Sequence, residues 1–280
     1  MQPSSVPVSV VIPCYRCAAT IGRAVASVAA QSVQAREVIV VDDCSTDDTL
    51  DNLYRLQKMY TEGWMKIISQ TVNGGPGTAR NAGWDAASQP YIAFLDADDT
   101  WHPDKLRIQY QAMCANPEVA ISGHAYSWSM ASQMAPITPE EPGIKAIKAS
   151  HLLLKNRFST PTVMLKKDLP FRFIAGKRYC EDYDLWLQIV LSGYKAIFIN
   201  APLTYLFKAP YGDSGLSAQL AKMERGELEA YLHLCRKDKI NIFLLMIVVF
   251  WSISKYLLRL AIVLFRNRFS MKKSSLQGHS

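Results

Sequence analysis

Three carboxylates follow an apolar run in residues 91–101, which read YIAFLDADDTW. The run ends in Asp96, Asp98 and Asp99, and like charges this close repel one another unless they are paired or bound to a cation. Mg²⁺ and Mn²⁺ take oxygen ligands of this kind and would cancel the charge. The stretch therefore indicates a divalent-metal site. A strand followed by a turn and a helix cap is the alternative, because aspartate also favours those positions.

The elements that must position these acids are short apolar runs in the first hundred residues. The runs are VSVVI (8–12), EVIVV (37–41), MKIIS (65–69) and YIAFL (91–95). Helical patterns separate them, as in residues 20–31, where Ile21, Val25 and Val28 share one face. Strand–helix units in series predict an α/β fold with a mostly parallel sheet and right-handed crossovers.

The residues that follow these strands form one candidate site, because ligands of such sheets bind outside the carboxyl ends of the strands. The set contains Pro13, Tyr15, Asp42, Asp43, Asn73, Arg80, Asp96, Asp98 and Asp99. An aromatic face, carboxylates, a guanidinium and a metal site are the parts needed to hold a nucleotide diphosphate. The stretch NGGPGTAR has neither the Gly-Lys-Ser/Thr of a Walker loop nor a full G-x-G-x-x-G, which argues against ATP or NAD.

Composition indicates a well-buried protein in a reducing, cytoplasmic setting. The chain has 280 residues with 49% hydrophobic content, enough for one sizeable α/β domain or two small ones. Its six cysteines lack disulfide spacing, and Cys14 and Cys17 read as free thiols rather than as a zinc or redox pair. The start MQPSSVPVSVVIP lacks the features of a signal peptide. The five histidines lack ligand spacing, so we assign them no metal.

The net charge of +7 lies in the last part of the chain. Residues 233–280 contain nine basic side chains and one acid, a balance of +8, which leaves −1 for residues 1–232. The larger part therefore has no electrostatic footprint for nucleic acid. We divide the chain into an α/β domain at 1–232 and a basic, apolar tail at 233–280.

The tail favours attachment to a membrane surface. Its uncharged run at 240–254 has 15 residues, whereas a span needs roughly 20. A longer segment would include Lys255 and Arg259, which are unfavourable in lipid. Basic residues flank both ends, so we expect a helix in the plane of an anionic leaflet, peripheral or monotopic. A helix that packs against protein is the alternative.

Five motifs in order resemble the inverting glycosyltransferases of family 2. They are PCY near the start, VIVVDDCSTDDT, NGGPGTARNAG, YIAFLDADDTW and CEDYDLWL, and the resemblance covers about residues 6–220. It implies the GT-A fold, with a Rossmann-like sheet that binds nucleotide-diphospho-sugars, in an enzyme of the bacterial surface-polysaccharide type. It also implies Mn²⁺ or Mg²⁺ as cofactor and a UDP-sugar foremost as donor.

The resemblance implies a role for each acidic motif. In Asp96-Ala97-Asp98, which matches the family's D-x-D, the first aspartate contacts the ribose and a later one holds the metal, with Asp98 and Asp99 both candidates. Further nucleotide contacts fall on Pro13, Tyr15, Asp42, Asp43, Asn73 and Arg80. The base that takes the acceptor's proton is Asp182, with Glu181 beside it. Stabilisation of a helix N-terminus is the alternative for this acidic pair.

Some residues depart from the family pattern or stay open. Arg16 stands where Asn is usual and Gln188 where Arg is common, and the Gln-x-x-Arg-Trp of processive synthases is absent, which favours transfer of one sugar. Lys208 and the loop YGDSGLS (211–217) could close over the diphosphate, although a surface turn is favoured. For Tyr126 and Trp128, core packing is favoured over stacking on a sugar.

We therefore expect a metal-dependent inverting glycosyltransferase at the cytoplasmic face of the inner membrane. Its acceptor would be a saccharide, expected to be lipid-linked, in the assembly of a surface polysaccharide such as O-antigen or capsule. Two alternatives stand. One is a transferase that acts directly on a polyprenyl phosphate, and the other is a nucleotide-sugar-binding protein without turnover.

Overall fold

The structure is a computed structural model that describes residues 5–128, 142–207 and 219–277, the last with side chains to residue 263. The strands are β1 (Ser5–Cys14), β2 (Gln34–Asp42), β3 (Met65–Ser69), β4 (Tyr91–Phe94), β5 (Thr100–Trp101), β6 (Val119–Trp128), β7 (Ile144–Ile147), β8 (Met164–Lys166) and β9 (Lys195–Leu206). The helices are α1 (Ile21–Ala29), α2 (Thr49–Gln57), α3 (Pro76–Ala86), α4 (Lys105–Ala115), α5 (Ala149–Leu154), the 3₁₀ turn η1 (Thr160–Thr162), α6 (Glu181–Leu191), α7 (Leu220–Arg236) and α8 (Ile242–Gln277).

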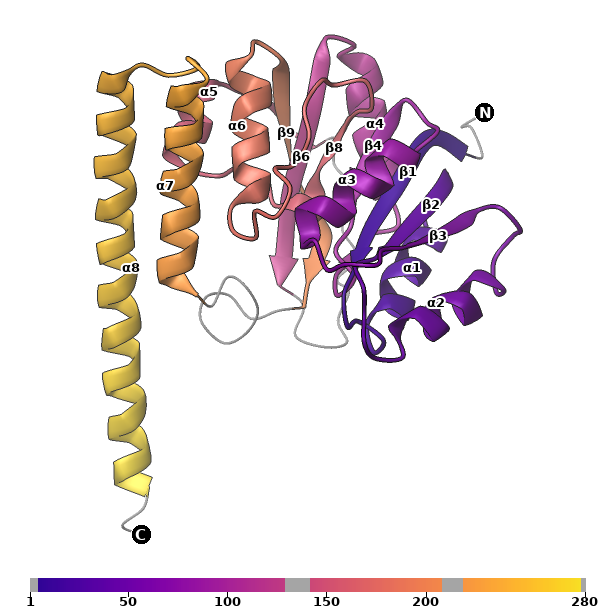
Figure 1. Cartoon of the computed structure of the whole chain (residues 1–280), viewed down its shortest axis with the longest axis horizontal. Coiled ribbons are helices and arrows are strands. Elements are labelled where there is room, and N and C mark those ends of the chain that lie inside the picture. The colour runs from indigo at the N-terminus through magenta and orange to yellow at the C-terminus, as the bar shows by residue number, and fades with distance from the viewer. Residues whose placement is uncertain (1–4, 129–141, 208–218, 278–280) are drawn as a thin grey trace.

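The described strands form one sheet in the order β3-β2-β1-β4-β8-β6-β9-β5, with β7 paired to β9 (Figure 1). β1 lies parallel to β2 and β4, and β2 lies parallel to β3. β8 runs antiparallel to both β4 and β6, whereas β6 and β9 are parallel. The predicted α/β fold with a mostly parallel sheet is confirmed, and a single short antiparallel strand joins its two parallel groups.

Neighbouring residues of the central strand β1 belong to two separate cores. Val10 is buried with Val25 of α1, whereas Val11 is buried with Trp84 of α3 and Trp186 of α6. Successive side chains of a strand point to opposite faces, so an unbroken apolar run is what a strand covered on both sides requires. Figure 1 shows helices on both sides of the sheet.

Helix α3 lies against β1 because small residues allow a close approach. A Cβ atom at Gly83 would come within 2.4 Å of Val11 Cγ1, so a larger residue would push the helix away from the strand. The nearby Ala79 is fully buried. This packing fixes Arg80, one residue further, at the carboxyl end of the sheet.

The last two helices lie side by side at the end of the molecule far from β3 (Figure 1). Leu245 and Val248 of α8 are buried in the same core as Trp186, so this part of the tail completes the core of the fold. The expected domain boundary between residues 232 and 233 falls inside α7. We therefore describe the tail from α8 onwards.

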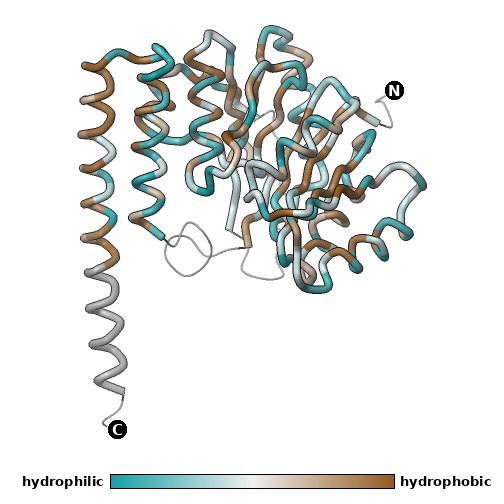
Figure 2. Tube along the Cα trace, viewed as in Figure 1, coloured by the Kyte–Doolittle hydropathy of each residue, from teal (hydrophilic) through white to brown (hydrophobic). Residues whose placement is uncertain are grey.

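The described part of α8 is rich in hydrophobic residues (Figure 2), many of which lie away from the core. Apart from Trp251, which bonds to Leu154 O, the exposed large side chains of this helix are Ile242, Phe243, Met246, Ile247, Phe250, Ile253, Leu257, Leu258 and Ile262, which we call the outer face of α8. In the part of the chain that the structure describes, Ile242–Val263 is long and apolar enough to cross a membrane by length and composition, with only 17% of its most apolar window buried in the protein.

Candidate active site

Arg80 joins two of the predicted acidic motifs. Its Nη2 donates to Asp96 Oδ1 at 2.8 Å and its Nη1 donates to Glu181 Oε1 at 2.9 Å. The Arg80 side chain is 6% exposed, and burial would lower its pKa, but the charges of Asp96 and Glu181 outweigh burial and raise the pKa. The guanidinium is therefore a fixed positive charge between the end of β4 and the start of α6.

The three acids at the start of α6 have three different environments. Glu181 is buried against Arg80, and Asp184 is fully buried, where it accepts hydrogen bonds from Lys177, Gln188 and His233. Asp182 lies between them and stays partly exposed. A helix N-terminus alone would not sort the three acids in this way, so Asp182 is the one whose carboxylate can meet a ligand.

Two donors hold the carboxylate of Asp182. Thr160 Oγ1 donates to its Oδ2 at 3.0 Å, and the backbone N–H of Tyr183 donates to its Oδ1 at 2.7 Å. Burial raises the pKa of Asp182, while Arg80 and the two donors act in the opposite direction. Burial and the charge of Asp182 also raise the pKa of Glu181, against the pull of Arg80. A carboxyl group with a raised pKa and a fixed orientation is suited to accept a proton.

The glycine-rich turn before α3 is built on Asp43. The backbone N–H groups of Gly74 and Gly75 each donate to one oxygen of Asp43 at 2.8 Å, and Gly75 has a φ of 84° that favours glycine. Burial raises the pKa of Asp43, and the two N–H donors oppose the rise. Each oxygen keeps a second lone pair for a ligand. Asp43 thus both shapes the turn and stays a predicted nucleotide contact.

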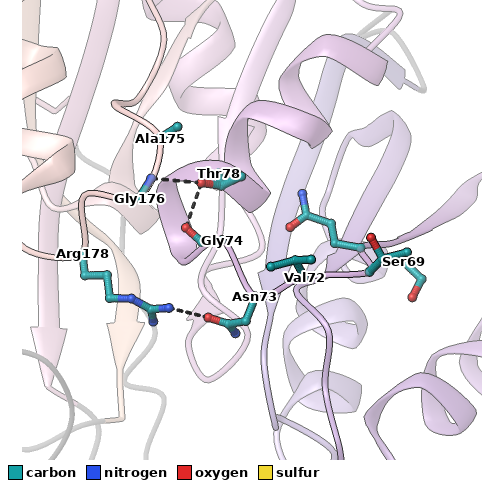
Figure 3. Close-up of a pocket in the computed structure, with 10 residues that line it drawn as sticks. Ser69, Val72, Asn73, Gly74, Thr78, Ala175, Gly176 and Arg178 are labelled. Atoms are coloured by element: carbon teal, nitrogen blue, oxygen red, sulfur yellow. Dashed lines mark hydrogen bonds between the residues drawn. The ribbon is translucent and has the colours of Figure 1, made fainter.

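Asn73 of this turn faces an open pocket of about 720 Å³. The Asn73 side chain donates to Asp43 O at 2.9 Å and accepts from Arg178 Nη2 at 2.6 Å. Figure 3 shows Arg178 reaching Asn73 from the segment before α6, while Gly176 N–H contacts the Thr78 hydroxyl. The pocket is lined by Ser69, Gln70, Thr71, Val72, Asn73, Gly74, Thr78, Ala175, Gly176 and Arg178.

The remaining predicted nucleotide contacts lie at the ends of β1 and β2. Pro13 pairs in register with Val41, and Asp42 is buried at the end of β2 with Ser45 N–H near its carboxylate. Tyr15 follows β1 and is 46% exposed, with the Arg16 guanidinium 5.4 Å from its ring centre. An exposed ring beside buried carboxylates is a suitable surface for a nucleobase.

Asp98 and Asp99 differ in burial. Asp99 is 5% exposed and its Oδ1 accepts from the backbone N–H of Phe207 at 3.2 Å, which ties the motif to the end of β9. Asp98 is partly exposed, and its carbonyl accepts from Arg23 at 2.6 Å. Among the described residues no group of three or more His, Cys, Asp or Glu is gathered to hold a metal. Mg²⁺ and Mn²⁺ are commonly bound by one or two carboxylates plus phosphates, so Asp98, the more exposed of the two predicted metal ligands, fits that chemistry.

Sequence reasoning missed Thr160 and Arg178, and it placed two aromatic residues wrongly. No motif marks Thr160, which contacts Asp182 from 22 positions away. Tyr126 and Trp128 are 43% and 44% exposed and meet edge to face at the end of β6, so the expectation that they pack in the core is wrong. Lys208 and the loop at 211–217 lie outside the described residues.

Known proteins resemble this chain in sequence and in fold. Residues 9–171 match Glycosyl transferase family 2. The Escherichia coli UDP-Glc:alpha-D-GlcNAc-diphosphoundecaprenol beta-1,3-glucosyltransferase WfaP is 32% identical over 202 residues, which cover 71% of this chain and 76% of WfaP.

Two solved structures share the fold. Staphylococcus aureus TarS 1-349 in complex with UDP-GlcNAc has a TM-score of 0.64 and 18% identity, over 81% of this chain and 66% of that chain. The mannosyltransferase PcManGT from Pyrobaculum calidifontis, in complex with GDP-Man and Mn²⁺, has a TM-score of 0.67 and 17% identity, over 99% and 82% respectively. With the family match, these likenesses confirm the predicted architecture: the chain belongs to glycosyltransferase family 2 and has the GT-A fold.

Proposed function

We propose that this glycosyltransferase uses a divalent cation and moves one sugar, with inversion, from a nucleotide-diphospho-sugar to a lipid-linked saccharide. The observation that carries the proposal is the bridge from Asp96 through Arg80 to Glu181, beside the oriented carboxylate of Asp182. It joins the residues expected to hold the nucleotide to the residue expected to take the proton.

The donor would lie across the carboxyl ends of β1, β2 and β4. Tyr15 would stack on the base, Asp42 and Asp43 would accept its hydrogen bonds, and Asp96 would contact the ribose. Asp98, the more exposed of the two metal candidates, would hold the cation, which supplies charge stabilisation to the diphosphate leaving group when bound. UDP-sugars stand first among the donors, since WfaP is named for UDP-Glc and TarS was solved with UDP-GlcNAc.

Asp182 would act as the general base. The acceptor hydroxyl would lose its proton to a carboxylate oxygen of Asp182 while that hydroxyl's oxygen bonds to the anomeric carbon. The bond from this carbon to the diphosphate breaks on the opposite face, so its configuration inverts. Glu181 cannot serve equally well, because its buried carboxylate already neutralises Arg80.

The outer face of α8 would bring the site to a membrane that carries the acceptor. The inner side of the helix packs on protein: Trp251 Nε1 donates to Leu154 O, and Lys255 Nζ pairs with Glu227 Oε1 at 2.7 Å. A helix held in this way cannot be surrounded by lipid, which favours a peripheral or monotopic position on the cytoplasmic face of the inner membrane. WfaP, named for a diphosphoundecaprenol-linked acceptor, supports a lipid-linked saccharide.

A transfer assay tests the proposal. Purified protein in detergent is mixed with a panel of UDP- and GDP-sugars and with GlcNAc-diphospholipid or polyprenyl phosphate, with Mn²⁺ or with EDTA. We expect metal-dependent transfer of one sugar to the saccharide-bearing lipid, and an anomeric configuration opposite to that of the donor by NMR. Transfer only to polyprenyl phosphate would show that the acceptor is polyprenyl phosphate itself and not a lipid-linked saccharide. Donor binding without product under any condition would show that the protein binds a nucleotide sugar without turnover.

A further inference from the structure

The short helix α5 ends in three backbone carbonyls that receive side chains from the three helices that follow it. Carbonyls in the last turn of a helix lack partners within the helix. Here Tyr183 of α6 donates to Leu152 O and Tyr231 of α7 to Leu153 O at 2.9 Å, while Trp251 and Lys255 of α8 donate to Leu154 O at 2.9 and 3.3 Å. We call these three carbonyls and their donors the α5 hub.

A second chain of contacts links the same helices directly. Lys255 of α8 pairs with Glu227 Oε1 at 2.7 Å. The Tyr231 hydroxyl oxygen lies 2.9 Å from the same Glu227 oxygen and 3.0 Å from the Tyr183 hydroxyl oxygen, so its single proton is shared between Leu153 O and Glu227 Oε1. Burial would raise the pKa of Glu227, but the hydrogen bond and charge of Lys255 outweigh it and lower the pKa. Burial raises the pKa of both tyrosines, so their hydroxyls keep the protons that these bonds need.

Both routes end at Asp182. Tyr183 is the next residue on α6, and its backbone N–H holds Asp182 Oδ1. The backbone that follows α5 continues through the fully buried Phe158 to Thr160, whose hydroxyl donates to Asp182 Oδ2. The carboxylate is thus oriented by two groups: the N–H of Tyr183, whose side chain belongs to the α5 hub, and the hydroxyl of Thr160, which follows α5 by six residues and whose turn packs on β4, β6 and β9.

We propose that α8 is a positioning element of the active site: through Lys255 and Trp251 it completes the α5 hub and thereby fixes the orientation of Asp182. The inference rests on the proposed function, because it assumes that Asp182 is the base. The inner side of α8 then serves catalysis, while the outer face meets the membrane. Tyr183, Tyr231 and Thr160 are positioning residues in the same sense.

Loss of the hub should lower turnover without weakening donor binding. The donor residues lie on β1, β2, β4 and α3, whereas the hub contacts α6 and the segment before η1. A general base that is less well oriented contributes less to the rate. We therefore expect kcat to fall roughly 10-fold, which is part of the 10² to 10⁴ that a general base supplies.

The test compares Tyr231→Phe and Lys255→Met with Ser254→Ala in the full-length chain. Tyr231→Phe keeps the ring and removes the hydroxyl that bridges Glu227 and Tyr183. Ser254 is the matched control, because it neighbours Lys255 and, among the residues that the structure describes, its hydroxyl bonds to Phe250 O of the same helix alone. All variants are assayed in one detergent with a short-chain, water-soluble acceptor, so that membrane attachment does not vary. The number of donor molecules bound per protein chain, measured by titration, gives the concentration of folded protein.

We expect both hub variants to lose roughly 10-fold in kcat per folded site, with the donor KM within about twofold, while Ser254→Ala behaves as wild type. A merely structural hub would lower Tm and the folded fraction but leave kcat per folded site unchanged, and that result would overturn the inference. If Lys255→Met does not fold, Tyr231→Phe decides alone. Wild-type protein without transfer would instead refute the proposed function, and full activity in Asp182→Asn would refute the role of Asp182.

Discussion

Two polar clusters, one around Glu37 and one around Asp182, lie at opposite ends of the same sheet, and the two carboxylates have opposite environments. Glu37 near the start of β2 accepts from Ser9, from the backbone and hydroxyl of Ser88 and from Lys66, all at 2.6–2.7 Å. Burial would raise the pKa of Glu37, but these donors outweigh it and lower the pKa to about 2. At the carboxyl end of the sheet, burial outweighs Arg80 and the two donors and raises the pKa of Asp182.

The difference shows that burial does not by itself determine what a carboxylate does. Glu37 has a donor for nearly every lone pair, so its charge is stable and it ties β1, β2, β3 and the start of β4 together. Asp182 has two protein donors and a partly exposed position, so it keeps the capacity to accept a proton. The first cluster stabilises the fold, and the second is available for chemistry.

The largest effect should come from Asp182→Asn, which removes the base at nearly constant shape. We expect turnover to fall by roughly 10² to 10⁴ while donor affinity stays within a few-fold. Initial rates and calorimetric donor titration measure the two quantities, with the exposed Asp168→Asn as control. Near-wild-type turnover would place the base elsewhere, with Glu181 and then Asp184 as the next residues to change.

Glu37→Gln should have the opposite profile, with lower stability and unchanged chemistry. Losing hydrogen bonds to a buried charged group costs about 1.5–3 kcal/mol. Because the pKa of Glu37 in the folded protein lies below its ordinary 4.5, the stabilisation is complete above that pH and disappears as the pH falls towards about 2. Urea unfolding at pH 7 and pH 3 should show the deficit shrinking.

The exposed Glu118→Gln is the control for this prediction, since its partner Lys195 lies 3.7 Å away and both side chains are largely exposed. We expect its stability within about 0.5 kcal/mol of wild type. A deficit for Glu37→Gln that is equal at both pH values would contradict the assigned role of its charge.

Asp98→Ala tests a carboxylate of a third kind, one expected to act through a cation. We expect donor affinity in Mn²⁺ to weaken roughly 10- to 100-fold, the range seen when groups that support a metal are lost, and the response to EDTA to disappear. Titration calorimetry with wild type and the exposed Asp51→Ala provides the reference. Binding that is insensitive to EDTA in every variant would reject the metal role.

Thr160→Val should give the smallest effect of these substitutions. It tests most directly the contrast between Glu37, which has many hydrogen-bond donors, and Asp182, which has two protein donors. It removes one donor from Asp182, and we expect kcat to fall about fivefold, close to the value of one hydrogen bond. Because Thr160 holds the pKa of Asp182 down, the acid limb of the kcat profile should move to higher pH; Arg80, Asp96 and the Tyr183 N–H still face the carboxylate.

Thr162→Val is the matched control, because its hydroxyl donates only to Ser159 O in the same turn. An unchanged acid limb in Thr160→Val would mean that the Thr160 hydrogen bond does not tune the base.

Local patterns predicted the first four strands well, but not the five later ones or the long-range partners. YIAFL and MKIIS are short stretches dominated by apolar residues, and they became β4 and β3 with nearly the predicted bounds. β8 has three residues and no such pattern. Its place between β4 and β6 depends on packing, which a single sequence does not display.

The same limit applies to the site and the tail. Arg80 and Glu181 were each singled out, yet their salt bridge joins positions 101 residues apart and was not foreseen. Lys255 counted against membrane burial, whereas the structure pairs it with Glu227, 28 residues earlier. Motifs identify residue types, but the partner that sets the charge and orientation of each is chosen by the fold.

The salt bridge between Arg80 and Glu181 also bears on synthesis at the ribosome. The first four strands and α3 are translated well before Glu181, and at roughly 5–20 residues per second the interval between the two partners lasts about 5–20 s. During that time Arg80 has only Asp96 as an acidic partner, and the core that covers α3 lacks α6. The nascent chain therefore carries an incomplete sheet that a chaperone can bind, and it acquires its candidate active site only after about two thirds of the protein has been made.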